Sequence, residues 1–275
     1  MIDWIASIFG ALIRFIYDLV GSNYGLSIIL FTVLTKLVLF PMNFKQAKAM
    51  KEMQKLAPLQ DEIRQKYKGN KEKQAEELAK AYEQHKINPM AGCLPLLIQL
   101  PIILAMFYIV RQPLTYILQL PDATVIEYAE EYLEKEEVTE KEAKAVEINM
   151  ASKLGLIDMN FAGVNFGDVP SDSMNKELQD RPSKWTLVVP VLSILLSYLQ
   201  TWISQRKSTM TEEQKQQQKS MNIMMPILSG YISYIMPLAL GIYWLLGNVL
   251  GIISQLIIDW MLGKEKILLE AENKK

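Results

Sequence analysis

The sequence YGLSIILFTVLTKLVLFPMNF, residues 24–44, is long and apolar enough to cross a lipid bilayer as a helix, and its one charged side chain is Lys36. Measured from Tyr24, Lys36 lies roughly 18 Å along such a helix and about 12 Å from its inner end, farther than a lysine stem comfortably reaches. A charge at this depth costs about 2.5–3.5 kcal/mol on insertion scales. We therefore expect a cavity, open to the cytoplasm, that solvates Lys36 and attracts acidic groups. The alternative is a structural lysine that partly reaches the interface or pairs with Asp259.

Four further apolar segments have membrane length. The last two form one run that would measure roughly 63 Å as a helix, too long for one crossing, so Pro237 and Gly241 are expected to form a re-entry turn. The first twenty residues place Asp3, Arg14 and Asp18 on one side of a helix, which predicts an amphipathic helix lying in the membrane interface. The four segments are about 93–112, 185–205, 221–238 and 241–262.

Charge predicts the orientation of these spans. The loop 113–184 carries 7 Lys or Arg against 15 acids. The segments 45–92, 206–220 and 263–275 carry 11, 4 and 4 basic residues against 7, 2 and 3 acids. The positive-inside rule therefore places the acidic loop outside and the other three segments in the cytoplasm. With five spans, the N-terminus is then outside and the C-terminus is in the cytoplasm.

The expected fold class is all-α: a polytopic membrane protein with five transmembrane helices, a cytoplasmic helical hairpin and an N-terminal amphipathic interfacial helix. Apolar residues at helical spacing on both sides of Gly69-Asn70 predict the hairpin, which is either a solvated spacer or a docking arm. The acidic extracellular loop is expected to hold one helix at about 122–154. In order, the expected segments are the interfacial helix at 1–20, the first span at 21–44, the hairpin at 45–92, the second span at 93–112, the extracellular loop at 113–184, the third span at 185–205, a cytoplasmic loop at 206–220, the fourth and fifth spans at 221–262 and a cytoplasmic tail at 263–275.

Polar residues inside the spans follow helical spacing, so each span carries them on one face. Such groups are costly in hydrocarbon unless they face each other or water. Facing polar stripes suggest a shared hydrophilic groove, although ordinary hydrogen bonding between helices is favoured for each serine taken singly. The expected groove residues are Lys36, Thr32, Asn43, Gln99, Gln200, Trp244, Asn248 and Gln255.

Composition argues against several classes of protein. The single Cys93 and the single His85 argue against a disulfide framework, a Cys-based metal site and a His-dependent protease, and we expect no catalytic residues, metal or cofactor. The net charge of −1 gives no basic field for nucleic acid. A small-anion transporter or channel that uses Lys36 is the main alternative function, although the two halves show no convincing repeat.

Several motifs, taken in order, resemble the YidC family of membrane protein insertases across about residues 20–263. The first span opens with SNYG at 22–25 and ends with TKLVLFP at 35–41. The hairpin leads into NPMAGCLPLLIQLP at 88–101, a highly specific string. The last two spans carry Met225-Pro226 and then Tyr243-Trp244, with Asn248 and Gln255 following.

The resemblance implies a five-helix core with a groove that is open to the cytoplasm and to lipid but closed outside. Its single cation, usually Arg in this family, is Lys36 here, and Gln200 and Trp244 match groove-lining positions. The resemblance implies an insertase of the bacterial cell membrane that makes and breaks no bonds. Its expected partners are nascent membrane proteins and the lipid bilayer, with the Sec translocon and the ribosome as candidates and no direct contact with nucleic acid.

Overall fold

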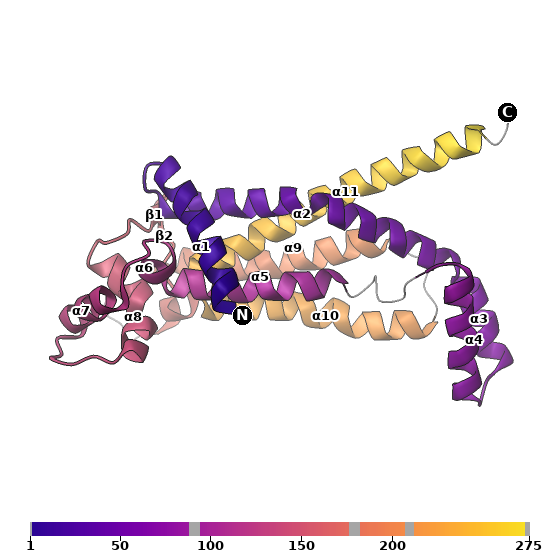
Figure 1. Ribbon diagram of the computed structural model, residues 1–275, viewed down its shortest axis with the longest axis horizontal. Helices are drawn as coiled ribbons and strands as arrows, with labels where there is room; N and C mark the ends of the chain where they lie inside the picture. The colour runs from indigo at the N-terminus through magenta and orange to yellow at the C-terminus, as the bar shows by residue number, and fades with distance from the viewer. Residues whose placement is uncertain (1, 88–93, 176–181, 207–211, 273–275) are drawn as a thin grey trace.

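The computed structural model describes residues 2–87, 94–175, 182–206 and 212–272. It is elongated and almost entirely helical, as the sequence predicts (Figure 1). Five long helices run along the described part of the molecule: α2 (Tyr24–Lys55), α5 (Leu94–Arg111), α9 (Val188–Gln205), α10 (Glu212–Ile235) and α11 (Leu238–Glu272).

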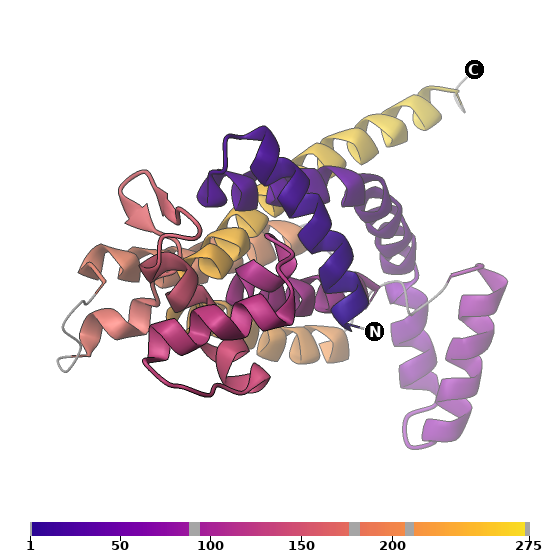
Figure 2. The ribbon, with the colours of Figure 1, turned by 60° about the vertical axis from the view of Figure 1, so that its left-hand side comes forward.

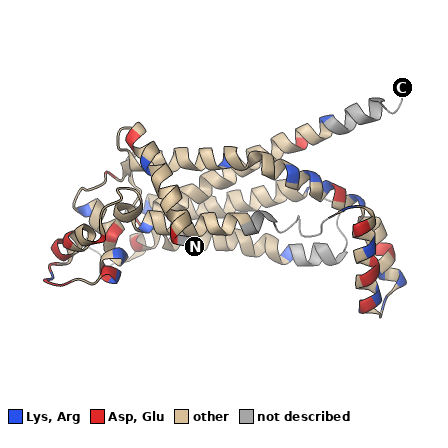
Figure 3. Ribbon diagram, in the orientation of Figure 1, with Lys and Arg blue, Asp and Glu red and all other residues tan. Residues whose placement is uncertain are grey.

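Length and composition allow three of the described helical stretches to cross a membrane. These are Tyr24–Lys55, Lys184–Gln205 and Leu238–Lys264, whereas Ile98–Arg111 of α5 is apolar but shorter. Charged residues gather at the two ends of the molecule and are sparse along its middle (Figure 3). Large apolar side chains such as Leu37, on α2, are exposed along the helices. Such a surface needs an apolar solvent, so a bilayer around the middle of the molecule accounts for it.

The SNYG motif builds the start of helix α2. Ser22 adopts a left-handed backbone with φ +62°, and the side-chain oxygen of Asn23 accepts a hydrogen bond from the Leu26 N–H at 2.8 Å. This bond caps the helix. Gly25 lies against Phe161, where a Cβ would come within 2.6 Å of the Phe161 Cβ, so the site accepts no larger residue without movement. The motif is therefore explained by one cap and one close contact.

Helix α2 does not end where the first apolar run ends, because it continues through Pro41 to Lys55. The predicted hairpin follows as α3 (Ala57–Lys66) and α4 (Lys71–Gln84). The predicted turn is present: Gly69 has φ +99°, and the Asn70 side chain accepts from the Lys73 N–H to cap α4. The hairpin stands apart from the helical bundle in both views (Figures 1 and 2). The expected re-entry turn is present at Met236 and Pro237, between the end of α10 and the start of α11, but Gly241 is not part of it because it lies inside α11.

Helix α1 (Ile2–Leu19) packs across α5 and α2. Ala6, Ile13 and Tyr17 are buried against the rest of the protein. Trp4, Phe15 and Leu19, on the opposite side, are 64–73% exposed. The expected polar stripe does not simply face water: Arg14 forms an ion pair with Asp18 at 2.9 Å and donates to the carbonyl oxygen of Leu118 at 3.2 Å. The helix thus joins the protein on two sides and presents a third, apolar side outward.

The acidic loop forms a folded cap at the other end of the molecule from the hairpin (Figure 1). The single helix expected at 122–154 is wrong, because the chain turns at Glu134 with φ +53° and starts again at a capping box formed by Thr139 and Glu142. A short antiparallel hairpin, unforeseen from the sequence, pairs Phe161 with Val164. The elements of the cap are α6 (Pro113–Tyr116), α7 (Asp122–Leu133), α8 (Glu140–Lys153), β1 (Asn160–Phe161), β2 (Val164–Asn165) and the 3₁₀ helices η2 (Pro170–Met174) and η3 (Lys184–Leu187).

A buried carboxylate joins two helices of the cap, α8 and α6. Glu147, on α8, has no exposed surface. It accepts hydrogen bonds from the Thr115 N–H at 2.7 Å and the Thr115 hydroxyl at 3.0 Å. Burial raises the pKa of Glu147 to about 7, against the smaller opposing effects of these bonds and of Lys144. The two bonds fix α8 against α6 across 32 residues of sequence.

Candidate functional site

Lys36 lies where helices α2 and α11 pack together. Its side chain is half-buried and runs over Gly247: a Cβ on that glycine would be 3.5 Å from the Lys36 Cε and 3.6 Å from its Nζ. Glycine at 247 therefore leaves the room that the lysine side chain occupies. Within residues 2–87, 94–175, 182–206 and 212–272, no acidic group forms an ion pair with Lys36.

Gln200, on α9, packs against α11 one turn beyond Gly247. Its side-chain amide packs so closely on Gly251 that a Cβ there would come within 2.9 Å of the Gln200 Cδ. Gly247 and Gly251 are four residues apart, so they form one notch on α11. The fold thus brings together a cation from α2 and an amide from α9 on one face of α11.

The alternative pairing of Lys36 with Asp259 is not observed, because the two residues lie too far apart. Asp259 lies 12 residues beyond Gly247, roughly 18 Å along α11. There it accepts a hydrogen bond from the Gln255 amide at 3.1 Å and lies 4.0 Å from the Arg206 guanidinium. Gln255 therefore belongs with Asp259 and Arg206, about two to three helical turns along α11 from Gly247 and Lys36.

The other predicted residues are more dispersed. Thr32 is fully buried and donates to the Ile28 carbonyl at 2.6 Å, so its hydroxyl is satisfied within its own helix. The Gln99 amide donates to the Tyr243 hydroxyl at 3.3 Å, which links α5 to α11. Trp244 and Asn43 are partly buried. Asn248 is buried, and its amide nitrogen has no hydrogen-bond partner in the described part of the chain.

The serine stripes serve mainly to join helices. Ser233 donates to the Ser193 hydroxyl at 3.1 Å, and Ser229 donates to the Ser193 carbonyl at 3.4 Å. All three serines are buried. Near the other end of the same helix pair, Gln205 and Asn222 exchange two amide hydrogen bonds of 2.6 Å. Ordinary hydrogen bonding between helices, the reading favoured for single serines, holds for Ser193 and its two partners.

Sequence reasoning missed Gly247, the residue that accommodates Lys36. A usable signal was present, because Gly247 and Gly251 form a small-xxx-small pair of the kind that lets membrane helices approach closely. It also missed a cavity of about 760 Å³ on the cap side, which Arg111 and Lys141 both line. No local pattern predicts that they share a cavity, because the two residues lie 30 positions apart on different helices.

Comparison with known proteins gives consistent matches. The family model described as "60Kd inner membrane protein" matches residues 15–265. The membrane protein insertase YidC of Fusobacterium nucleatum is 30% identical over 237 residues, which are 86% of this chain and 86% of that protein. The protein of the same name from Clostridium perfringens is 28% identical and is matched over 83% of its length.

Other relatives are longer than this chain. The YidC of Chlamydia trachomatis is 30% identical over 95% of this chain, but the match spans only 29% of that protein. A crystal structure of an active YidC insertase with its first transmembrane domain resolved matches with a TM-score of 0.52 and 23% identity. That match covers 90% of this chain and 45% of the other, and it shows a shared fold.

Proposed function

The chain belongs to the family of 60Kd inner membrane proteins that includes the YidC insertases, and we propose that it inserts newly made proteins into the lipid bilayer of a bacterial cell membrane. In this proposal the protein makes and breaks no bonds. Its substrates are hydrophobic segments of nascent membrane proteins, each with a short polar head that must cross. The Sec translocon and the ribosome are proposed as partners that deliver these segments.

The observation that carries the proposal is the position of Lys36. A lone ammonium half-buried among apolar helices is costly unless water or an anion solvates it. It is held beside the Gly247 notch, and no acid of the described chain neutralises it. The unpartnered amide of Asn248, one residue beyond Gly247, adds a second polar group that gains from water or a peptide carbonyl. A hydrophilic groove between α2, α9 and α11 would give both Lys36 and Asn248 access to water.

We propose that this groove shortens the apolar path across which the polar head must pass. Lys36 attracts an acidic side chain of the head into the groove, and the water around it lowers the desolvation cost of that head. With the N-terminus outside, the cap lies outside and the groove opens to the cytoplasm. An acidic head then also moves outward favourably in the membrane potential, by about 2.3 kcal/mol per charge per 100 mV. The apolar segment leaves sideways into lipid, driven by burial of its own surface.

The α3–α4 hairpin is proposed to receive the substrate first. It stands away from the bundle on the side opposite the cap, so it can reach a chain that has not yet met the membrane (Figure 2). Its surface carries both signs of charge, including the ion pairs of Lys80 with Glu76 and Glu77. Such a surface suits brief contact with varied clients better than tight binding of one.

The test is insertion of a single-span reporter with an acidic head into proteoliposomes, scored by protection of the translocated head from protease. Lys36→Arg keeps the charge and is expected to insert the reporter as the wild type does. Lys36→Gln is expected to lower insertion by about tenfold, which corresponds to roughly 1.4 kcal/mol of lost attraction. Lys45→Gln, which removes an exposed cation from the same helix, is the matched control and is expected to have little effect.

Two results would count against the proposal in different ways. Equal insertion by all four proteins would keep the insertase but remove the role of Lys36. No insertion above empty liposomes, together with a Lys36-dependent flux of a small anion, would favour the transporter alternative. The flux of chloride or phosphate should therefore be measured in the same vesicles.

A further inference from the structure

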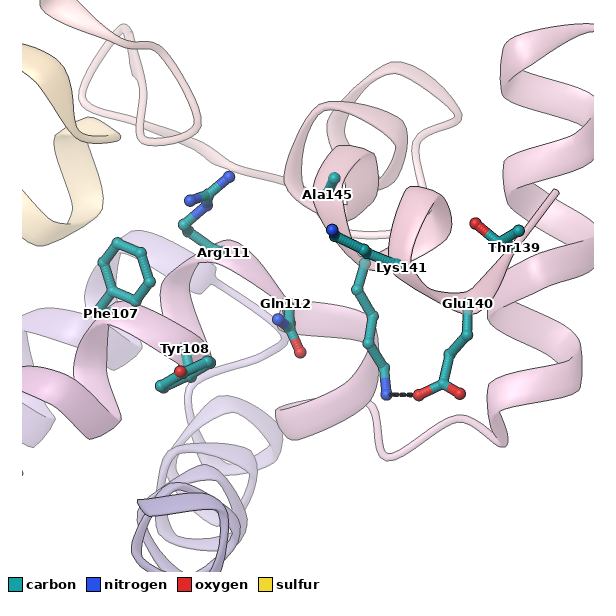
Figure 4. Close-up of a pocket in the computed structure, with 9 residues that line it drawn as sticks. Phe107, Tyr108, Arg111, Gln112, Thr139, Glu140, Lys141 and Ala145 are labelled. Carbon is teal, nitrogen blue, oxygen red and sulfur yellow. Dashed lines mark hydrogen bonds and ion pairs between the residues drawn. The ribbon is translucent and has the colours of Figure 1, made fainter.

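An open cavity of about 760 Å³ lies between the outer end of α5 and the start of α8 (Figure 4). Phe107, Tyr108, Arg111 and Gln112 line it from the α5 side, and Thr139, Glu140, Lys141, Lys144 and Ala145 line it from the start of α8. Figure 4 shows Arg111 and Lys141 on opposite sides of this space, with Gln112 between them. Nothing in the proposed insertion mechanism uses these residues.

Two of the three cations at the cavity form no ion pair with the described residues of the cap. Lys144 is engaged, because it forms ion pairs with Glu140 and, at 3.4 Å, with Asp122. In the described part of the chain, neither Arg111 nor Lys141 forms an ion pair. The guanidinium of Arg111 instead lies over the Phe107 ring, 5.2 Å from its centre, which holds it at the cavity.

These free cations are unusual for their surroundings. The segment 113–184 carries 15 acids and only 7 basic residues. Acidic partners are therefore abundant on the cap, and Glu140 itself lines the cavity, but its carboxylate is paired with Lys144. Arg111 and Lys141 line the same cavity without an ion pair to a described residue. Cations beside an aromatic wall are suited to a phosphate group, which guanidinium binds in a bidentate manner.

The cavity also lies at the level of lipid headgroups. Arg111 is the last residue of the apolar helix α5, so it marks the outer edge of the second span. Helix α1 crosses α5 beside this edge and exposes Trp4, Phe15 and Leu19 outward. Tyrosine side chains such as Tyr108 are typical of this interfacial zone. A phosphate bound here would therefore carry its acyl chains into the neighbouring bilayer.

We propose that this cavity binds the phosphate of an anionic phospholipid from the outer leaflet, held by Arg111 and Lys141 with its glycerol against Phe107 and Tyr108. The site uses the outer face of the protein, so it is separate from the Lys36 groove. It depends on the cap lying outside but not on insertase activity. A bound lipid would bridge α5 and α8 and so anchor the cap on the membrane surface.

The experiment is calorimetric titration of the full chain in a neutral detergent. The ligands are dihexanoyl phosphatidylglycerol, dihexanoyl phosphatidylcholine, glycerol 1-phosphate, inorganic phosphate and a hexapeptide of Asp and Glu. The test variant is Arg111→Gln with Lys141→Gln, supported by Lys141→Gln alone because that side chain is exposed and its loss should not affect folding. The matched control is Lys153→Gln with Lys184→Gln, which removes two cap cations outside the cavity. Circular dichroism checks that every variant is folded.

We expect phosphatidylglycerol to bind best. Two basic residues contribute about fivefold each near an anionic lipid, so the test variant should bind about thirtyfold more weakly, and the control pair should bind as the wild type does. If glycerol 1-phosphate or inorganic phosphate bound as tightly as phosphatidylglycerol, the cavity would be a site for a soluble phosphate, and the proposal of a lipid site would be overturned. Equal affinity for the acidic peptide, or an equal loss in the control pair, would reduce the site to general charge attraction and overturn it as well.

Discussion

The Lys36 ammonium of α2 lies beside Gly247 of α11, so that a methyl group at that glycine would be 3.6 Å from the lysine nitrogen. This is ordinary van der Waals distance, so a methyl group would fit beside the lysine but a larger side chain would not. Glycine costs a helix interior up to about 1 kcal/mol relative to alanine. Glycine at 247 therefore lowers the stability of helix α11, and the Lys36 side chain occupies the space that it leaves.

A larger side chain at position 247 is expected to lower insertion activity more than it lowers the stability of the protein. Gly247→Ala should fold well and insert an acidic reporter nearly as the wild type does, because its methyl group fits. Gly247→Leu should displace the Lys36 side chain and lower insertion by about tenfold, as for the loss of the charge itself. Insertion into proteoliposomes measures both. The control is Gly263→Leu, also on α11, where a Cβ meets nothing within 4 Å. Full activity of Gly247→Leu would show that the place of the ammonium is unimportant.

The pKa of Glu147 predicts how the stability of the cap varies with pH. Its folded value of about 7 lies above the ordinary carboxyl value, so the folded state holds the proton more tightly. Stability is then greatest below about pH 4.5 and falls as the pH rises through 7, by at most about 3 kcal/mol. Glu147→Gln should remove this slope and make the protein more stable than the wild type at pH 8. The thermal midpoint of the purified protein between pH 5 and 8 measures it.

Glu142 provides the matched control for that experiment. Bonds from the Thr139 N–H and hydroxyl, with Lys135 nearby, lower the pKa of Glu142 to about 2. It therefore stays ionised throughout the range from pH 5 to 8, and Glu142→Gln should shift the midpoint equally at each pH. Parallel curves for the wild type and Glu147→Gln would show that the buried carboxyl does not govern the cap.

The sequence predicts the long helices well because each rests on a local property, the length of an apolar run. The polar stripe of α11 likewise predicts that Asn248 faces the protein, and Asn248 is buried. Local pattern also explains the turn at Gly69.

Contacts between distant segments could not be predicted in this way. Lys36 and Gly247 are separated by 211 positions, and no periodicity reports which helix lies opposite. Thr32 shows the converse: its spacing places it on the polar face, but its hydroxyl donates to the Ile28 carbonyl within its own helix and not to another span. Sequence spacing assigns a residue to a face, but only packing decides which partner meets it.

The contact of Gly25 with Phe161 gives a test of how the cap is joined to the first span. A Cβ at Gly25 would lie 2.6 Å from the Phe161 Cβ and 3.0 Å from its Cγ. Gly25→Ala should therefore destabilise the protein by about 1–3 kcal/mol, as overpacked sites do. Phe161→Ala should not relieve the clash, because alanine keeps the offending Cβ. Phe161→Gly removes it, so Gly25→Ala should cost less in that background than in the wild type. Thermal midpoints of the single and double variants provide the cycle, and additive effects would mean that the two segments do not touch in this way.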